Sequence, residues 1–128
     1  MYNWYAVNDP RGLAPEGWHI PTDFEWQTTV TCLGGAGSAG GAMKERGTAN
    51  WSSPNTGADN LSGFAAMPGG FRSSNGSFAF IRDIGSYWTA SEDDSSNSWN
   101  HSFSKTNDDV LRIPSTKVFG LSVRCIRD

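Results

Sequence analysis

Gly-Ser-Tyr-Trp-Thr-Ala-Ser-Glu (residues 85–92) and Gly-Leu-Ser-Val-Arg-Cys-Ile-Arg-Asp (residues 120–128) are the two best-defined strand sequences of this chain. The second one alternates, with Leu121, Val123 and Cys125 on one face and polar residues between them, as a half-buried strand does. Between the two lies a segment rich in Ser, Asn and Asp that is interrupted by single apolar residues. Rigid strands that flank a chemically varied segment commonly build a binding surface.

The length and composition limit the class of protein. A chain of 128 residues fits one domain with a single core. The net charge of −3, with scattered Arg and Lys, gives no electrostatic basis for binding nucleic acid or an anionic membrane. The 15 Gly, 6 Trp and 7 Phe indicate irregular backbone held by large aromatic anchors, a profile typical of extracellular recognition modules. No apolar run approaches membrane-spanning length and no signal peptide is evident at the start, so we expect no membrane insertion.

One helix is strongly indicated. Thr22 and Glu25 form a capping box, which predicts that the helix begins at about Asp23. An apolar stripe with spacing i, i+4 and i+7 follows, and a glycine pair ends the helix. The stripe is Trp26, Val30 and Leu33, and the pair is Gly34-Gly35.

The rest of the chain predicts short strands and long loops. Residues 2–7 resemble a short aromatic strand, residues 40–46 could form one helical turn, and residues 51–62 are a loop of turn-forming residues. The further strand candidates are residues 63–67, 77–82, 86–91, 98–104, 109–113 and 119–126. One helix followed by several short strands predicts an α+β fold.

Few residues are arranged for chemistry. Residues 35–40 match G-x-G-x-x-G, but a helix precedes them where a dinucleotide site requires a strand, so a loop is favoured. His19 and His101 have no metal-ligand partner at short spacing, and we expect His19 to be buried and hydrogen-bonded. Calcium binding is one interpretation of the oxygen-bearing side chains in Asp93-Asp94 and Asn107-Asp108-Asp109. Solvated turns explain these residues better, because the spacing of the EF-hand loop is absent. No nucleophile–base pair is evident, so we expect no enzyme and no cofactor.

Several longer motifs resemble a known family. They are Tyr-Asn-Trp-Tyr-Ala-Val (2–7), Gly-Trp-His-Ile-Pro-Thr-Asp-x-Glu-Trp (17–26), Leu-Gly-Gly (33–35), Pro-Asn-Thr-Gly-Ala (54–58), Ser-Gly-Phe (62–64), Pro-Gly-Gly-Phe-Arg (68–72), Tyr-Trp-x-x-Ser-Glu (87–92) and Ser-Val-Arg-Cys (122–125). Together they resemble the bacterial FISUMP family, the "major paralogous domain" of surface proteins. The resemblance implies a single C-type-lectin-like domain over residues 1–128, in the branch that includes the formylglycine-generating enzymes. Family members usually carry further strand-forming residues before the first motif, so we expect the first strand pair to be missing or rebuilt.

The same resemblance bears on the cysteines and on calcium. Formylglycine-generating oxidases use a cysteine pair in the C-terminal region, where this chain has only Cys125. In C-type lectins a disulfide joins the first helix to the last strand, which implies a Cys32–Cys125 pair. Against it, Cys32 lies about 120° around the helix from Trp26, and the family often lacks a cysteine there. Two buried thiols are the alternative. The sugar-binding motifs of calcium-dependent lectins have only weak counterparts at residues 53–55 and 99–101, without the acidic ligand.

A second resemblance concerns the variable proteins of diversity-generating retroelements, which mutate adenines in chosen codons and spare the scaffold. Around Arg112, Lys117 and Gly120, the interspersed residues can all arise from an AAC codon by changing its adenines. Apolar residues among them are hard to explain in a solvated loop and are typical of a selected contact patch. The predicted ligand-binding residues are Asp93, Asp94, Ser96, Asn97, Asn100, His101, Ser104, Thr106, Asn107, Asp108, Asp109, Leu111, Ile113, Pro114, Ser115, Thr116, Val118 and Phe119.

These observations predict a monomeric, non-enzymatic recognition module on a bacterial surface or a phage particle. Residues 93–119 would form the binding face for a protein or glycan on another cell or particle, with Trp99, Phe103 and Arg112 as framework. Leu111, Ile113, Pro114, Val118 and Phe119 would form one exposed patch, bordered by Asn100, His101, Asp108 and Asp109. The alternatives are a structural or carbohydrate-binding module of a surface protein, and an oxidase that would need copper and a reactive thiol pair.

Overall fold

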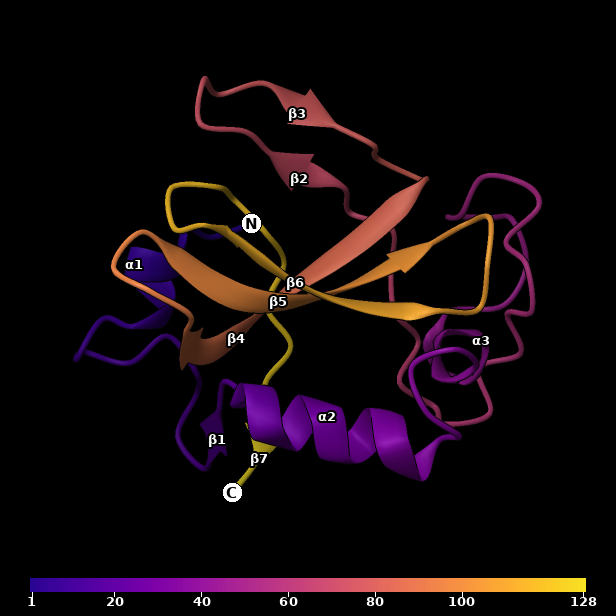
Figure 1. The fold of residues 1–128 in the computed structure, drawn as a ribbon, viewed down its shortest axis with the longest axis horizontal. Helices are drawn as coiled ribbons and strands as arrows, with labels where there is room; N and C mark the ends of the chain where they lie inside the picture. Colours follow the sequence, from indigo (N-terminus) through magenta and orange to yellow (C-terminus); the bar gives the residue numbers. More distant parts are fainter.

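A three-stranded antiparallel sheet lies at the centre of the fold in the computed structural model, which describes residues 1–128 (Figure 1). Its strands are β4 (Ile84–Glu92), β5 (Asn97–Ser104) and β6 (Val110–Thr116), in that order across the sheet. These strands confirm the candidates at 86–91, 98–104 and 109–113. Because directly paired residues share a face, Tyr87, His101 and Arg112 point to one side of the sheet, and so do Phe103 and Val110.

Helix α2 (Asp23–Cys32) covers that side, as the capping box and the apolar stripe predict (Figure 1). Both hydrogen bonds of the Thr22–Glu25 capping box are present. Gly34 and Gly35, both with positive φ, follow the helix end. Trp26 packs against Tyr87 and Phe103 in the first hydrophobic core. That core consists of Trp26, Val30, Ala39, Met43, Trp51, Ala66, Tyr87, Phe103 and Val110.

A second core lies beside the first and contains the N-terminal segment. The prediction of a strand over residues 2–7 is wrong: Trp4–Val7 form a short helix, α1, because the Asn3 side chain accepts the Ala6 N–H as an N-cap. Trp4 is buried and donates its indole N–H to Thr89 O. The members of this core are Trp4, Val7, Ile20, Trp88 and Leu121.

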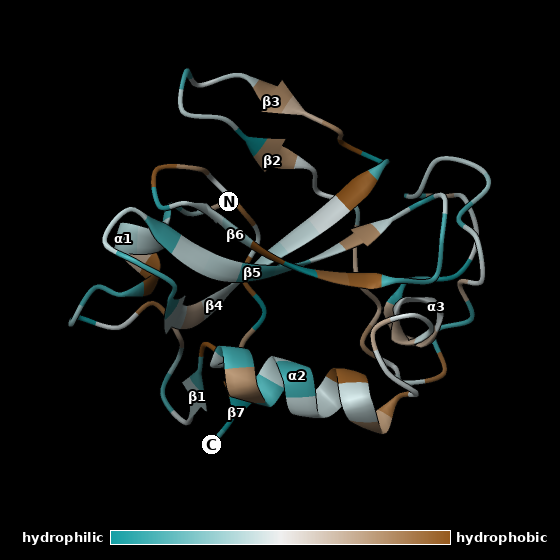
Figure 2. Ribbon diagram, in the orientation of Figure 1, coloured by the Kyte–Doolittle hydropathy of each residue, from teal (hydrophilic) through white to brown (hydrophobic).

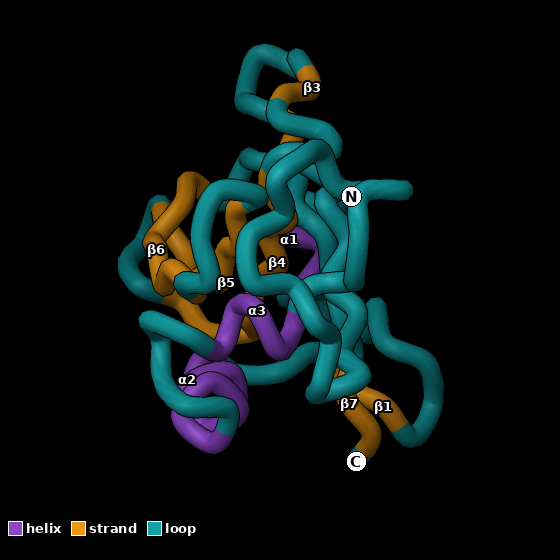
Figure 3. The backbone as a smooth tube through the Cα atoms, turned by 90° about the vertical axis from the view of Figure 1, so that its right-hand side faces the viewer, coloured by secondary structure: helices purple, strands orange, loops and turns teal.

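The remaining elements are short. They are β1 (Trp18–His19), α3 (Ala39–Met43), β2 (Phe71–Arg72), β3 (Phe78–Ala79) and β7 (Ile126–Arg127). Strand β1 pairs with β7, and β2 pairs with β3 in a hairpin that projects from the sheet on the side opposite α2 (Figures 1 and 3). The predicted strand at 63–67 is reduced to one bridge at Ala66, and the predicted final strand is divided into single bridges at 120–122 and β7. The class is α+β, and none of the three helices has the length and apolar composition needed to cross a bilayer.

Two buried lysines organise the long loops. The Lys44 ammonium donates to the carbonyl oxygens of Thr56, Ser104 and Asn107 at 2.7, 2.9 and 2.8 Å. Burial lowers the pKa of Lys44. The Lys117 ammonium donates to Glu92 Oε1 at 2.9 Å and to two carbonyl oxygens of the β4–β5 loop. Each ammonium therefore gathers segments that are remote in sequence.

Candidate ligand-binding face

Strand alternation divides the residues of β6 between two sides of the sheet. Leu111 pairs with Ser102 and Ile113 pairs with Asn100, on the side away from α2. Leu111 is 52% exposed and Ile113 is 40% exposed, as predicted. Pro114 is also exposed, but it lies one residue further along the strand and so points to the other side. The predicted patch of five residues is therefore split between two faces.

The β2–β3 hairpin completes the apolar surface on the side away from α2. The Phe71 ring stacks on Phe119 with a centroid distance of 5.8 Å and on Phe80 at 5.6 Å. Val118 lines a shallow hollow together with Phe78 and Ile81. Figure 2 shows apolar stretches both on this hairpin and on β6. These residues lie on both faces of the hairpin, because Phe71 pairs with Ala79 and Arg72 pairs with Phe78, so that Phe71 and Phe78 point to opposite faces. We call the apolar surface on and beside the hairpin the apolar face, and it consists of Phe71, Phe78, Phe80, Ile81, Leu111, Ile113, Val118 and Phe119.

Backbone contacts hold the hairpin beside the segment that follows β6. Arg72 exchanges both backbone hydrogen bonds with Gly120, each 2.8 Å long. Gly70 has a φ of +64°, and a Cβ there would collide with Ala79 O and lie 2.7 Å from Ile81 N. A glycine is required at this position because the two arms of the hairpin approach so closely. Phe80 itself has a φ of +57°, which is rare for a bulky residue.

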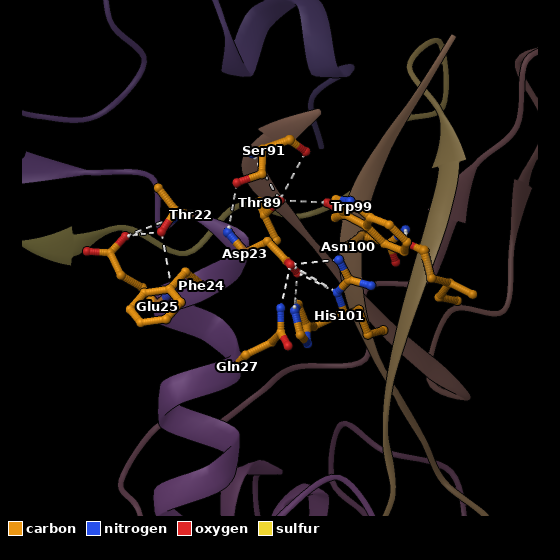
Figure 4. A network of polar contacts seen from close by, with 12 residues as sticks. Thr22, Asp23, Phe24, Glu25, Gln27, Thr89, Ser91, Trp99, Asn100 and His101 are labelled. Carbon is orange, nitrogen blue, oxygen red and sulfur yellow. Dashed lines mark hydrogen bonds and ion pairs between the residues drawn. The ribbon is translucent and has the colours of Figure 1, made fainter. Parts of the chain in front are cut away.

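On the opposite side of the sheet, Asp23 connects α2 to β5 and β6 (Figure 4). Its carboxylate accepts hydrogen bonds from Arg112 Nε at 2.9 and 3.0 Å, from Gln27 Nε2 at 2.6 Å and from His101 Nε2 at 3.1 Å. Burial raises the pKa of Asp23, but the hydrogen bonds from Arg112 and His101 outweigh it, so the pKa lies below its usual value. The Arg112 guanidinium also lies 3.3 Å from the centroid of the Trp99 ring. These contacts hold Arg112 between α2 and Trp99, and the framework role of the two residues stays a prediction.

His101 belongs to this buried network, and its prediction as a ligand contact is wrong. It is 2% exposed and stacks on Trp26 at a centroid distance of 5.0 Å. An ionised Asp23 can only accept, so His101 Nε2 carries the hydrogen, and Nδ1 has no partner. Burial lowers the pKa of His101, although Asp23 opposes the shift. His19, expected to be buried, is instead partly exposed and lies between Asp128 and Glu25.

Asn100 is also buried, at 1% exposure, and so does not border an exposed patch as predicted. Its Nδ2 donates to Ile113 O at 2.9 Å and to Ser115 Oγ at 2.8 Å. Asn100 therefore holds β6 in place by hydrogen bonds, and it lines a small pocket on the side of the sheet away from α2.

The other predicted residues lie in or beside the two loops at opposite ends of β5, including Asn97 and Ser104 at the ends of β5 and Ser115 and Thr116 at the end of β6. One loop connects β4 to β5 and the other connects β5 to β6, and an eight-residue strand separates them by about 25 Å. One compact contact surface therefore cannot include both loops. Asp93, Asp94, Ser96, Thr106 and Thr116 are exposed, whereas Asn97, Ser104, Asn107, Asp108, Asp109 and Ser115 are partly buried.

The acidic residues of these loops make turns. Asp94 Oδ1 accepts the backbone N–H groups of Ser96 and Asn97, at 2.7 and 2.8 Å. Asp108 packs its carboxylate against Gly57, and its carbonyl oxygen accepts the Gly40 N–H. The structure contains no group of three His, Cys, Asp or Glu side chains placed to hold a metal ion.

Both cysteines are free thiols, so the predicted Cys32–Cys125 disulfide is wrong. Cys32 is exposed because the same helix turns Trp26 and Val30 towards the core and leaves the Cys32 side chain outside. Cys125 is partly buried beside the second core, and burial raises the pKa of its thiol.

The sequence signals for the hairpin half of the apolar face were present but indistinct. Phe78, Phe80 and Ile81 fall within the predicted strand at 77–82, where three large apolar residues do not keep the alternation of a half-buried strand. That departure from alternation was the available sign that some of them stay exposed.

The fold and this face define a small α+β domain with two hydrophobic cores and an exposed apolar surface on and beside the β2–β3 hairpin. Residues 1–127 match the Fibrobacter succinogenes major domain, and the chain belongs to this family of bacterial paralogous domains. The match confirms the family part of the resemblance seen in the sequence. No curated protein and no solved structure matched the chain.

Proposed function

We propose that this domain is a non-enzymatic recognition module that binds a protein partner through the apolar face, on a C-type-lectin-like scaffold. The observation that carries the proposal is the gathering of exposed apolar side chains from two remote segments on one side of the sheet. Six of them, Phe78, Phe80, Ile81, Leu111, Ile113 and Val118, are 40–62% exposed. Exposed apolar side chains that gather in this way usually mark a site that a partner covers.

The chemistry of the surface favours a protein over a glycan. Interface centres are enriched in aromatic side chains and depleted of charge, and here two stacked aromatic pairs lie among aliphatic residues. One cation, Arg72, lies over the Phe78 ring at 6.0 Å. A glycan would require more polar groups than this surface offers.

The arrangement also supports a variable contact surface. The backbone of β6 is anchored through Arg112 and Asn100, and Lys117 anchors the segment after it. Leu111 and Ile113 lie on the side of β6 opposite Arg112, and Asn100 holds β6 through the backbone oxygen of Ile113, so the side chains of Leu111, Ile113 and Val118 can be exchanged without removing these anchoring contacts. Such a division suits a variable protein of a diversity-generating retroelement, displayed on a bacterial surface or a phage particle.

Gene sequences test the variable surface. Sister genes from the same source should differ mainly at exposed positions of residues 93–119 and keep Trp88, Phe103 and Arg112. A reverse-transcriptase gene and a near-copy of the 3′ coding segment should lie nearby. Even variation along the chain would contradict this part of the proposal.

A display experiment tests the face itself. One library randomises the exposed residues Leu111, Ile113 and Val118, and the matched control library randomises the exposed residues Tyr5, Phe24 and Leu61. Both are selected against hen egg-white lysozyme. Binders from the first library should lose at least tenfold in affinity when Phe78 and Ile81 become serine, because the hairpin forms half of the surface. Binders that arise equally from both libraries and ignore the hairpin would refute the proposal.

A further inference from the structure

The apolar face contains one pocket with a polar floor. The pocket has a volume of about 130 Å³ and lies between the hairpin, β6 and the side of the sheet away from α2. Phe71, Phe119 and Ile113 contribute its apolar walls, together with Ile84 and Leu121. Asn100, Ser86 and Ser102, all buried, contribute the polar groups.

Asn100 presents an unused hydrogen-bond acceptor to this pocket. Its orientation is determined, because Ile113 O can only accept and must therefore face the amide nitrogen. The nitrogen end is occupied by Ile113 O and Ser115 Oγ, and no group of the chain donates to Oδ1. Oδ1 is also not among the unpartnered side-chain atoms that are sealed from solvent. Since Asn100 lines the pocket, a ligand that enters there can reach this oxygen.

The two serines add a donor. Ser86 Oγ and Ser102 Oγ lie 2.9 Å apart, so one hydroxyl donates to the other. The second hydroxyl keeps its hydrogen free, because no other acceptor contacts the pair. The floor therefore offers one acceptor and one donor to a ligand in the pocket.

We propose that this pocket binds a phenol ring, supplied by a tyrosine side chain of the protein partner. An apolar cavity of about 150 Å³ holds one benzene ring in another protein, so this pocket is of the right size for a single ring. The ring contacts Phe71, Phe119 and Ile113. The hydroxyl donates to Asn100 Oδ1 and accepts from the serine pair, whereas a purely apolar group would leave Asn100 Oδ1 dehydrated and unpaired. Only the source of the ring rests on the proposed function.

The test compares p-cresol with toluene, which has the same ring and methyl group but no hydroxyl. Each is titrated into the domain while the methyl NMR signals of Ile113, Ile84 and Leu121 are followed. The signals should shift with p-cresol, and toluene should bind about tenfold more weakly because Asn100 Oδ1 then loses its partner. Equal affinities, or no shift at Ile113, would overturn the proposal.

Variants separate the pocket from the surrounding surface. Ile113→Ser should weaken both ligands, whereas Leu111→Ser, a matched change on the same side of β6 but outside the pocket, should weaken neither. Ser86→Ala should reduce the preference for p-cresol. If Leu111→Ser weakened binding as much as Ile113→Ser, the pocket would not be the site.

The source of the ring is tested with N-acetyl-tyrosinamide. Binding at least as tight as that of p-cresol supports a tyrosine side chain, and failure to bind while p-cresol binds overturns it. Failure of all three ligands would overturn the pocket but leave the hairpin dependence of selected binders intact, so the two proposals fail separately.

Discussion

Acidification should destabilise the domain through His101, and the structure gives both the sign and the size of the effect. His101 is buried as the neutral tautomer, and its Nδ1 has no partner. A second proton would create a buried N–H without an acceptor, so burial lowers the pKa of His101. Because the pKa of the folded state lies below that of the unfolded chain, the unfolded state binds more protons as the pH falls below about 6.5. Stability is therefore present above that pH and is lost below it.

The magnitude is limited by one proton. A single group changes the free energy of unfolding by at most about 1.4 kcal/mol per pH unit. Lowering the pH from about 6.5 to about 5 therefore reduces the free energy of unfolding by up to about 2 kcal/mol. This loss occurs even if the hydrogen bond between His101 and Asp23 stays intact.

The assay is urea unfolding between pH 5 and 8, in a His19→Gln background. His19 must be removed because hydrogen bonds to Asp128 and Glu25 raise its pKa, so its contribution has the opposite sign and is lost as the pH rises. His101→Phe keeps a ring for stacking on Trp26 and abolishes the titration. Stability should decline below about pH 6.5 in His19→Gln and much less in the double variant. Equal slopes would refute the assignment to His101.

Three further predictions concern the face, the hairpin and the thiols. Replacing Leu111, Ile113 and Val118 together with serine should change the free energy of unfolding by no more than about 0.5 kcal/mol for each residue, whereas Phe103→Ala should cost about 3–5 kcal/mol. Thermal melting checks both variants. A loss from the triple variant as large as that from Phe103→Ala would show that these side chains pack in the core. Gly70→Ala should destabilise the domain by about 1–3 kcal/mol. The loss should exceed that of Gly47→Ala, because Gly47 also has a positive φ but has open space around it. Equal losses in urea unfolding would mean that the close approach of Gly70 to Ala79 does not affect stability. Cys32 should react with a thiol reagent faster than Cys125 in the native protein, since Cys32 is exposed and burial raises the pKa of Cys125; a native protein with no reactive thiol would indicate a disulfide after all.

The elements that could be predicted from the sequence are those whose signals are local. Thr22 and Glu25 are three residues apart, and their two hydrogen bonds start α2 where the pattern indicates. The strands β4 and β5 could be predicted because aromatic residues mark them, Tyr87 and Trp88 in β4 and Trp99 and Phe103 in β5. Residues 4–7 were assigned wrongly because four residues are too few for a periodicity, and the Asn3 cap was outweighed by the aromatic composition.

The candidate site depends on partners that are remote in the chain. His101 is separated from Asp23 by 78 residues, so nothing in its Ser-rich and Asn-rich surroundings indicates burial. The apolar residues of β6 could be predicted to be exposed because they stand out in a polar segment. Their counterparts on the hairpin could not be connected to them, because the stacking of Phe71 on Phe119 appears only in the folded chain.

Lys44 and Lys117 place a cation where loop carbonyls converge, a task for which many loop-rich proteins use a bound metal ion. A bound ion stabilises the folded state only in proportion to its concentration relative to its dissociation constant. An ammonium that is covalently attached to the chain has no such dependence, since dilution and chelators cannot remove it. The order that these two lysines give to the loops, and with it to the neighbouring strand β6, is therefore built covalently into the chain.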